Sequence, residues 1–148
     1  MSSAENVDLI RSLHPGPHVD IAALVNDEEA AGRLRNAIGH LFDPAIKATM
    51  RFPGLAPVTY SGLDGMRTAW RDWLMHRTSY SDEIEDVIGD GDRVIVVHRG
   101  YRRDSPDAPE SVLKRVTVWT LQQGRIVGVD FNVPYADALP AARAQSGS

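Results

Sequence analysis

The chain has 148 residues with a net charge of −4, from 16 basic and 20 acidic side chains, and it contains no cysteine. A chain of this length is expected to form a single domain over residues 1–148, with a core over about residues 5–141 and a small, polar tail at 142–148 that is disordered. The lack of cysteine excludes disulfides, thiolate nucleophiles and cysteine-ligated metal sites. The interspersed charges form no basic stripe, so nucleic acid is not an expected partner.

No apolar run approaches the roughly 18 residues of a membrane span, and no membrane association is expected. The first six residues, Met1 to Asn6, lack the basic and apolar regions of a signal peptide. We therefore expect a cytoplasmic protein.

Three helices are predicted in the first third of the chain. The first runs from residue 4 or 5 to Leu13, where Pro15 and Pro17 stop it. A second is expected over residues 18–25. The third begins after a cap at Asn26-Asp27 and continues to Phe42, because the following Asp43-Pro44 disfavours helical geometry.

The strongest helical pattern in the chain covers residues 62–74. Its apolar residues fall along one stripe, with charged residues opposite: Leu63, Met66, Trp70, Trp73 and Leu74. Two tryptophans on one stripe require a broad apolar partner, which only the following strands can supply. Both indoles could belong to the core, or one could line a cavity between helix and sheet.

Strands are predicted from Ile46 onward, where apolar and polar residues begin to alternate over 46–52. Further strands are expected at residues 81–88, 93–101, 111–122 and 125–133. The acidic run at Asp82, Glu83, Glu85 and Asp86 predicts a solvated edge strand, which would discourage edge-to-edge pairing.

A two-residue turn at Gln123-Gly124 predicts the register of the last hairpin, with Gln122 opposite Arg125 and Val118 opposite Val129. This register places an apolar set on the inner face: Val116, Val118, Thr120, Val127, Val129 and Phe131. The outer face then carries a tryptophan with a polar rim, which is typical of a protein interface. We therefore predict a homodimer through Arg115, Trp119 and Asn132, with a solvated sheet face as the alternative.

Several segments together resemble the SnoaL-like branch of the nuclear transport factor 2-like superfamily: Tyr60 to Gly65, Trp70 to Leu74, Gly91 to Val94, and Val118 to Val127. The resemblance implies an α+β cone, in which a curved mixed sheet wraps around N-terminal helices and one central amphipathic helix. It also implies a pocket at the wide end and, commonly, a homodimer. Members include polyketide cyclases, ketosteroid isomerases, epoxide hydrolases, dehydratases and pocket-bearing proteins without known chemistry, so the fold alone does not decide the function.

The acids that two of these branches use are missing. The aspartate that the cyclase and epoxide-hydrolase branches carry on the last strand is matched by Phe131. The Arg-x-Asp of the epoxide-hydrolase branch is matched by His98 and Gly100. Chemistry through the usual acids is therefore not expected.

His98 is the candidate catalytic residue, because it shares the parity of Val94 and Val96 on a central strand and titrates near neutrality. A satisfied core histidine is the alternative, and if the strand register is wrong the candidate becomes Asp130. The predicted wall consists of Met50, Phe52, Tyr60, Trp70, Val96, Val116, Val118, Val129 and Phe131, which suits a small, flat, largely apolar ligand.

Two classes of function remain open. One is a cofactor-independent isomerase, cyclase or dehydratase acting on such a ligand. The other is a non-catalytic ligand-binding or dimerisation module. No metal is expected, because Pro15-Gly16-Pro17 prevents His14 and His18 from sharing a helical face.

Overall fold

The computed structural model describes residues 3–14, 16, 18–75, 78–134 and 136–138. Its helices are α1 (Ser3–Leu13), α2 (Ile21–Asn26), α3 (Glu28–Ile38), the short 3-10 helix η1 (Gly39–Leu41) and α4 (Gly62–Trp73). Its strands are β1 (Phe42–Met50), β2 (Val58–Ser61), β3 (Ser79–Asp90), β4 (Arg93–Arg103), β5 (Ser111–Gln122) and β6 (Arg125–Phe131).

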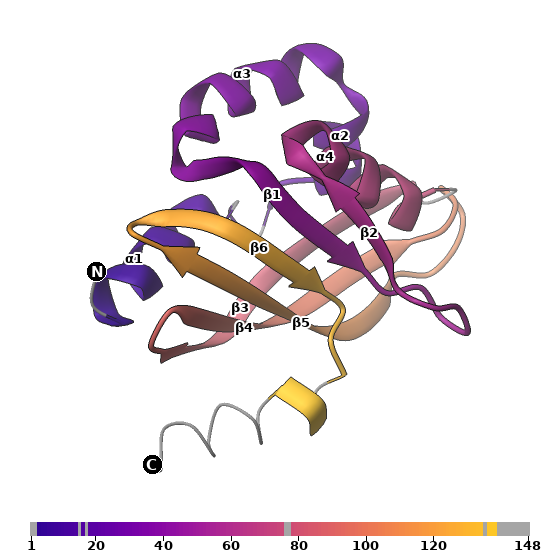
Figure 1. Ribbon diagram of the computed structural model, residues 1–148. Helices are drawn as coiled ribbons and strands as arrows, with labels where there is room; N and C mark the ends of the chain where they lie inside the picture. The colour runs from indigo at the N-terminus through magenta and orange to yellow at the C-terminus, as the bar shows by residue number, and fades with distance from the viewer. Residues whose placement is uncertain (1–2, 15, 17, 76–77, 135, 139–148) are drawn as a thin grey trace.

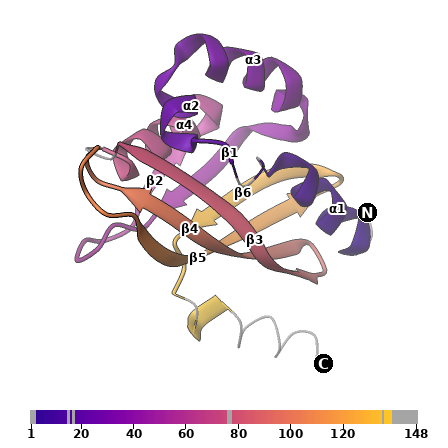
Figure 2. The ribbon, with the colours of Figure 1, turned by 180° about the vertical axis from the view of Figure 1, so that it is seen from behind.

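The strands form one curved sheet in the order β2-β1-β6-β5-β4-β3. Only β1 and β6 run parallel, and the other neighbours are antiparallel. Helices α2, α3 and α4 lie over one face of the sheet, and residues 136–138 lie beyond the other (Figure 1). Seen from behind, α1 lies along β3 and the β3–β4 hairpin (Figure 2). This arrangement is the predicted α+β cone.

The central helix α4 forms where its apolar stripe predicts. It begins at Gly62, whose φ of 75° suits a residue without a side chain, and Ala69 at its centre is fully buried. Trp70 and Trp73 are partly buried and pack against the main core. Because α4 packs mainly on β1, its stripe closes one wall of the space above the sheet.

The first strand is longer than the pattern predicts, because it begins at Phe42 while α3 already ends at Ile38. The alternation itself is confirmed, since Ile46, Ala48 and Met50 are each 0% exposed. Pro44 fits inside the strand because the pairing of β1 with β6 is irregular between Phe42 and Lys47, where the sheet needs no N–H donor.

The predicted register of the last hairpin is correct only next to the turn. Gln122 pairs with Arg125 and Leu121 with Ile126, but Thr120 pairs with Gly128, which leaves Val127 as an extra residue in β6. Such a bulge shifts the register by one, and side chains alternate with a period of two. Every residue of β5 before Leu121 therefore meets a different partner from the predicted one.

The shift reverses the predicted faces of β5. Arg115 and Trp119 point to the helix side of the sheet, together with Thr117. Val116 and Val118 point to the opposite side, where they pack with Ile95, Val97 and Ala138. On this outer face Val133 and Ala138 pack against part of the apolar set, and the mixed face of β5 lies under the helices.

The acidic part of β3 is only partly a solvated edge. The strand does lie at the sheet edge, and Glu85 and Asp86 are exposed as predicted. Asp82, however, is 1% exposed, because it shares the inner face with Ile84. The prediction of a solvent-facing carboxylate at this position is wrong.

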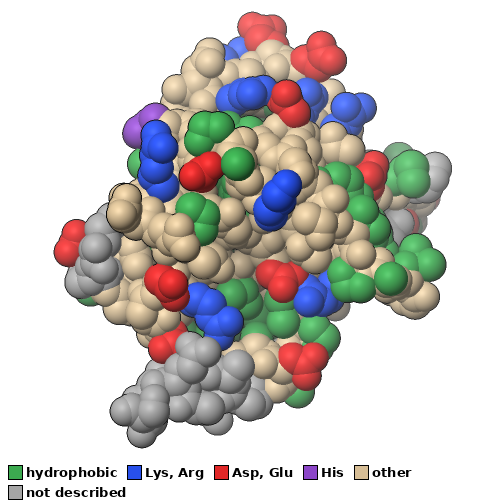
Figure 3. All heavy atoms as spheres, viewed as in Figure 1, with side chains coloured by type: hydrophobic (Ala, Val, Ile, Leu, Met, Phe, Trp, Pro, Cys, Tyr) green, Lys and Arg blue, Asp and Glu red, His purple; other side chains and the backbone are tan. Residues whose placement is uncertain are grey.

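Charged side chains of both signs are spread over the surface around α3 and α4, without a block of one sign (Figure 3). None of the helices in the described ranges is long and apolar enough to cross a membrane.

Candidate functional site

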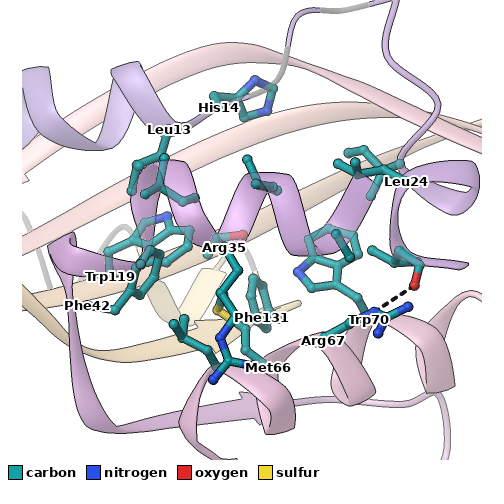
Figure 4. A pocket seen from close by; sticks show the side chains of 18 of the residues that line it. Leu13, His14, Leu24, Arg35, Phe42, Met66, Arg67, Trp70, Trp119 and Phe131 are labelled. Atoms are coloured by element: carbon teal, nitrogen blue, oxygen red, sulfur yellow. Dashed lines mark hydrogen bonds between the residues drawn. The ribbon is translucent and has the colours of Figure 1, made fainter. Parts of the chain in front are cut away.

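A cavity of about 280 Å³ lies between the helices and the inner face of the sheet. Residues of all four α-helices line its sides, and residues of β3, β4 and β5 form its polar floor. Most of the wall is apolar or aromatic, as Leu13, Leu24, Phe42, Met66 and Trp119 show in Figure 4. Such a cavity fits a small, largely apolar molecule whose orientation is set by a few polar contacts.

The floor is organised around an ion pair between Asp82 and Arg115, whose side chains are only 1% and 3% exposed. The Arg115 Nη2 atom donates to Asp82 Oδ2 at 2.6 Å. Arg115 Nε donates to the hydroxyl oxygen of Tyr80 at 2.5 Å, and that hydroxyl donates to Asp82 Oδ2 at 3.0 Å. Since the fully buried Tyr80 bridges the pair, the three groups form one closed hydrogen-bonded unit.

The guanidinium of Arg115 is also enclosed by aromatic rings. Its central carbon lies 4.9 Å from the ring centroid of Trp70, 5.1 Å from that of Trp73 and 5.5 Å from that of Tyr80. The negative faces of these rings stabilise a cation that water cannot reach. The tryptophans of α4 therefore have an electrostatic role as well as an apolar one.

Two histidines complete the floor. His14, at the end of α1, places Nε2 2.7 Å from Asp82 Oδ1. His98 places Nδ1 3.7 Å from Asp82 Oδ2, and its Nε2 lies 3.2 Å from the Thr117 hydroxyl. The two imidazoles stack with their centroids 5.2 Å apart. One carboxylate thus connects two imidazoles and a guanidinium.

Asp82 stays ionised in this setting. Burial by itself would raise the pKa of its carboxyl, but the contacts of His14 and His98 and the charge of Arg115 outweigh burial and hold that pKa well below its usual range. Burial also opposes the charge of Arg115, yet Tyr80 and Asp82 raise the pKa of the guanidinium. The pair is therefore charged throughout the physiological range.

His98 is held in its neutral form. Burial lowers the pKa of its imidazole, the nearby carboxylate of Asp82 opposes this, and the charges of Arg115 and His14 reinforce it. Its Nδ1 atom is buried without a hydrogen-bond partner among the described residues. His98 lines the cavity, with Nδ1 3.7 Å from Asp82 Oδ2, and a neutral imidazole in this position is a candidate acceptor for a proton from a bound molecule.

The same residues meet the distance requirement for a metal ion. Ligand-type atoms of His14, Asp82 and His98 all lie within 4.8 Å of one another. Both oxygens of Asp82 already accept from protein donors, however, and the buried guanidinium of Arg115 places a positive charge on the same carboxylate. A second cation there would be repelled, so the arrangement favours proton transfer over metal binding.

The comparisons agree with this architecture. A family model described as the SnoaL-like domain matches residues 21–129. The chain belongs to the SnoaL-like family. No curated protein matches its sequence.

Solved structures show the same fold at low sequence identity. An NTF2-like protein of unknown function from Burkholderia pseudomallei has 19% identity and a TM-score of 0.63, with 96% of this chain and 98% of that chain covered. TerC, co-crystallised with polyporic acid, has 17% identity and a TM-score of 0.62, with 93% and 97% covered. A protein from Jannaschia named as a SnoaL-like polyketide cyclase has 15% identity and a TM-score of 0.60, with 94% and 91% covered. These likenesses establish the nuclear transport factor 2-like fold.

This SnoaL-like chain supplies its buried acid from an unexpected strand. Gly100 stands where the epoxide-hydrolase resemblance expects an aspartate, and a Cβ atom there would lie 2.6 Å from the hydroxyl oxygen of Tyr80. Asp82 lies directly opposite Gly100 on the neighbouring strand. The space of a side chain at position 100 is thus occupied by Tyr80, which positions Asp82 instead.

The structure places four of the predicted site residues of the SnoaL-like protein on the cavity wall: Trp70, Val96, His98 and Phe131. Met50 and Val129 lie in the main core, and Phe52 packs against it, but none of these is on the wall. Tyr60 lies away from the cavity, because its hydroxyl donates to Asp72 at 2.8 Å.

Because of the bulge at Val127, the remaining predicted site residues lie on the other face of the sheet. Val116 and Val118 belong to the opposite face of the sheet, so their assignment to the cavity is wrong. The alternative catalytic candidate, Asp130, also lies on that face, where it forms an ion pair with Arg51. The candidate on the cavity wall is therefore His98.

The predicted dimer surface is not on the outside of the SnoaL-like fold. Trp119 lines the cavity, Arg115 is buried, and Asn132 accepts a hydrogen bond from Arg115 at 3.3 Å. These residues cannot present a polar-rimmed indole to a partner. A homodimer itself stays a prediction.

Sequence reasoning missed Asp82, Arg115, Tyr80 and His14. One signal was present, because Tyr80, Asp82 and Ile84 alternate with Ser81, Glu83 and Glu85 along β3 and so share a face. The other partners come from distant segments: Asp82 is 33 positions from Arg115 and 68 from His14. Only the folded chain brings them together.

Proposed function

We propose that this protein binds a small, flat, largely apolar molecule in the cavity and moves a proton on it without a cofactor, as an isomerase, cyclase or dehydratase does. One observation carries the proposal. A neutral histidine with an unengaged nitrogen lies beside a buried, ionised aspartate at the floor of an apolar cavity. Perturbed titratable groups in such a setting are typical of active sites.

His98 is the proposed proton acceptor. If Nε2–H donates to the Thr117 hydroxyl, the lone pair of the ring is on Nδ1. Nδ1 then takes the proton from a carbon next to a carbonyl group, and the electron pair moves to the carbonyl oxygen as an enolate. The imidazolium that forms has the carboxylate of Asp82 3.7 Å from Nδ1. Return of the proton to another atom of the enolate completes an isomerisation.

Asp82 is proposed to stabilise the imidazolium and to position His14, rather than to take the proton itself. Its two oxygens already accept from His14, Tyr80 and Arg115. A carboxylate with such partners is a weak base. His14 is a second proton carrier, because its Nε2 contacts Asp82 and leaves Nδ1 available.

A flat ring ketone tests the proposal. With 1-tetralone in D₂O, the protein should accelerate exchange of the protons beside the carbonyl in a saturable manner, as followed by proton NMR. His98→Asn should return the rate to the uncatalysed level, and the rate of His14→Asn shows whether the second imidazole takes part. His40→Asn is the matched control, because His40 is exposed and does not line the cavity. Unchanged exchange in His98→Asn would refute the proposed base.

The non-catalytic alternative rests on the same ion pair. Protein donors already occupy both oxygens of Asp82, so the floor could serve to orient a ligand without reacting with it. Saturable binding of 1-tetralone without proton exchange would favour this alternative.

A further inference from the structure

A third arginine lines the cavity, on the side opposite the floor. Arg67 belongs to α4 and is partly buried, and its Nε donates to the carbonyl oxygen of Val25 at 3.0 Å. This bond joins α4 to the end of α2 and uses only one of the five guanidinium N–H donors. Figure 4 shows Arg67 beside Trp70, with His14 on the far side of the cavity.

No acidic side chain in the described ranges balances the charge of Arg67. Of the other two arginines on the wall, Arg115 pairs with Asp82 and Arg35 pairs with Asp64. Across the described residues, no carboxylate forms an ion pair with Arg67. A partly buried guanidinium without a counterion loses hydration that an anion would restore.

Two acidic residues line the cavity outside its floor, Glu28 and Asp64. Asp64 pairs with Arg35 and forms no ion pair with Arg67. Glu28 is exposed in the first turn of α3, where the helix N-terminus stabilises its negative charge. It is not within ion-pair distance of Arg67. The Arg67 donors that remain are therefore open to a molecule in the cavity.

We propose that Arg67 binds a carboxylate of the ligand, so that the substrate class is a flat apolar ring compound carrying one acid group. The inference rests on the proposed function and narrows its substrate. A guanidinium whose Nε is fixed presents its two amino groups in the plane that suits a bidentate contact with a carboxylate. The apolar body would lie against Trp70 and Phe131, with its other end toward His98.

A matched pair of probes separates charge from shape. 2-Naphthoate and 2-naphthamide have nearly the same size and differ in charge, and calorimetric titration at pH 7.5 gives their dissociation constants. The wild-type protein should bind naphthoate about tenfold more tightly than naphthamide, a ratio typical of a charged hydrogen bond. Arg67→Gln should weaken naphthoate about tenfold and leave naphthamide within about twofold.

Arg71→Gln is the control variant. Arg71 lies one turn further along α4, is exposed and does not line the cavity, so the same change of charge there should alter neither constant. Equal affinity of the wild-type protein for both probes would overturn the role of Arg67 while leaving the proposed apolar site intact. A preference for naphthoate that survives in Arg67→Gln, or that Arg35→Gln removes instead, would also overturn it. Failure to bind either probe would overturn the proposed function as well.

Discussion

Replacing Asp82 by Asn should strongly destabilise the protein, because it removes the negative charge and keeps the shape. Arg115 would stay buried with its side chain 3% exposed and without a counterion. The amide would also turn an N–H group toward the donors that now point at Oδ1 or Oδ2, namely His14, Tyr80 and Arg115. Breaking a buried pair from one side costs about 3–5 kcal/mol.

A surface pair gives the scale for comparison. Asp130 pairs with Arg51, and their side chains are 37% and 32% exposed. Pairs with this exposure contribute about 0–1 kcal/mol, so Asp130→Asn should change stability by no more than that. The unfolding equilibrium constants of the two variants should therefore differ by about tenfold or more, because one ion pair is buried and the other is half-exposed.

Urea unfolding followed by tryptophan fluorescence measures the difference. With a slope of about 2 kcal/mol per molar urea, the midpoint of Asp82→Asn should fall by roughly 2 M at pH 7. The contribution of Asp82 is present above its ordinary pKa of 3.8 and is lost as the pH falls below that value, because the folded-state pKa is lower. The gap between wild type and variant should therefore narrow in acid.

The result that refutes this reasoning is a cost for Asp82→Asn as small as that for Asp130→Asn. If the single variant does not fold, the double variant Asp82→Asn with Arg115→Met decides the question. Removing the orphaned cation should recover much of the stability, because a buried pair exchanged for neutral groups is often close to neutral. A double variant no more stable than the single one would contradict the ion-pair argument.

Because burial lowers the pKa of His98 from 6.5, the wild-type free energy of unfolding should decrease by up to about 1.4 kcal/mol per pH unit as the pH falls below 6.5. Urea unfolding of His98→Asn between pH 7.5 and 5 should lack this decrease. Parallel plots of stability against pH for the two proteins would contradict the prediction. Gly100→Ala should destabilise the protein by about 1–3 kcal/mol in the same assay, because the new Cβ would clash with the Tyr80 side chain. Gly32→Ala, in α3, should instead stabilise the protein by up to about 1 kcal/mol, because its Cβ would have no atom within 4 Å and alanine favours the helix. We predict that the homodimer forms through the outer face of β5, where Val112 is 61% exposed. Sedimentation should show a wild-type dimer, and Val112→Glu should dissociate it. A wild-type monomer at micromolar concentration would count against this prediction.

The sequence alone determined the elements whose patterns are local. The apolar stripe of α4 and the alternation at Ile46, Ala48 and Met50 each follow from one segment and one period, and the structure agrees with both. The turn at Gln123-Gly124 was also readable, since Gln123 and Gly124 have φ values of 51° and 77°, as a tight hairpin requires. Local periodicity is visible in sequence because each residue's direction depends only on its own element.

The faces of the last hairpin and the composition of the site were decided by tertiary structure. The bulge at Val127 has no signature in the local pattern, and it reversed the face of every residue of β5 beyond it. The apolar residues of β5 do not by themselves indicate which face is inside, because both faces of the sheet carry an apolar cluster. The local sequence pattern predicts Asp82 as a surface acid, and only the folded chain places Arg115, Tyr80 and His14 around it. A buried charge is stabilised by partners from distant segments, and those partners adjoin only after the sheet has curved around its helices.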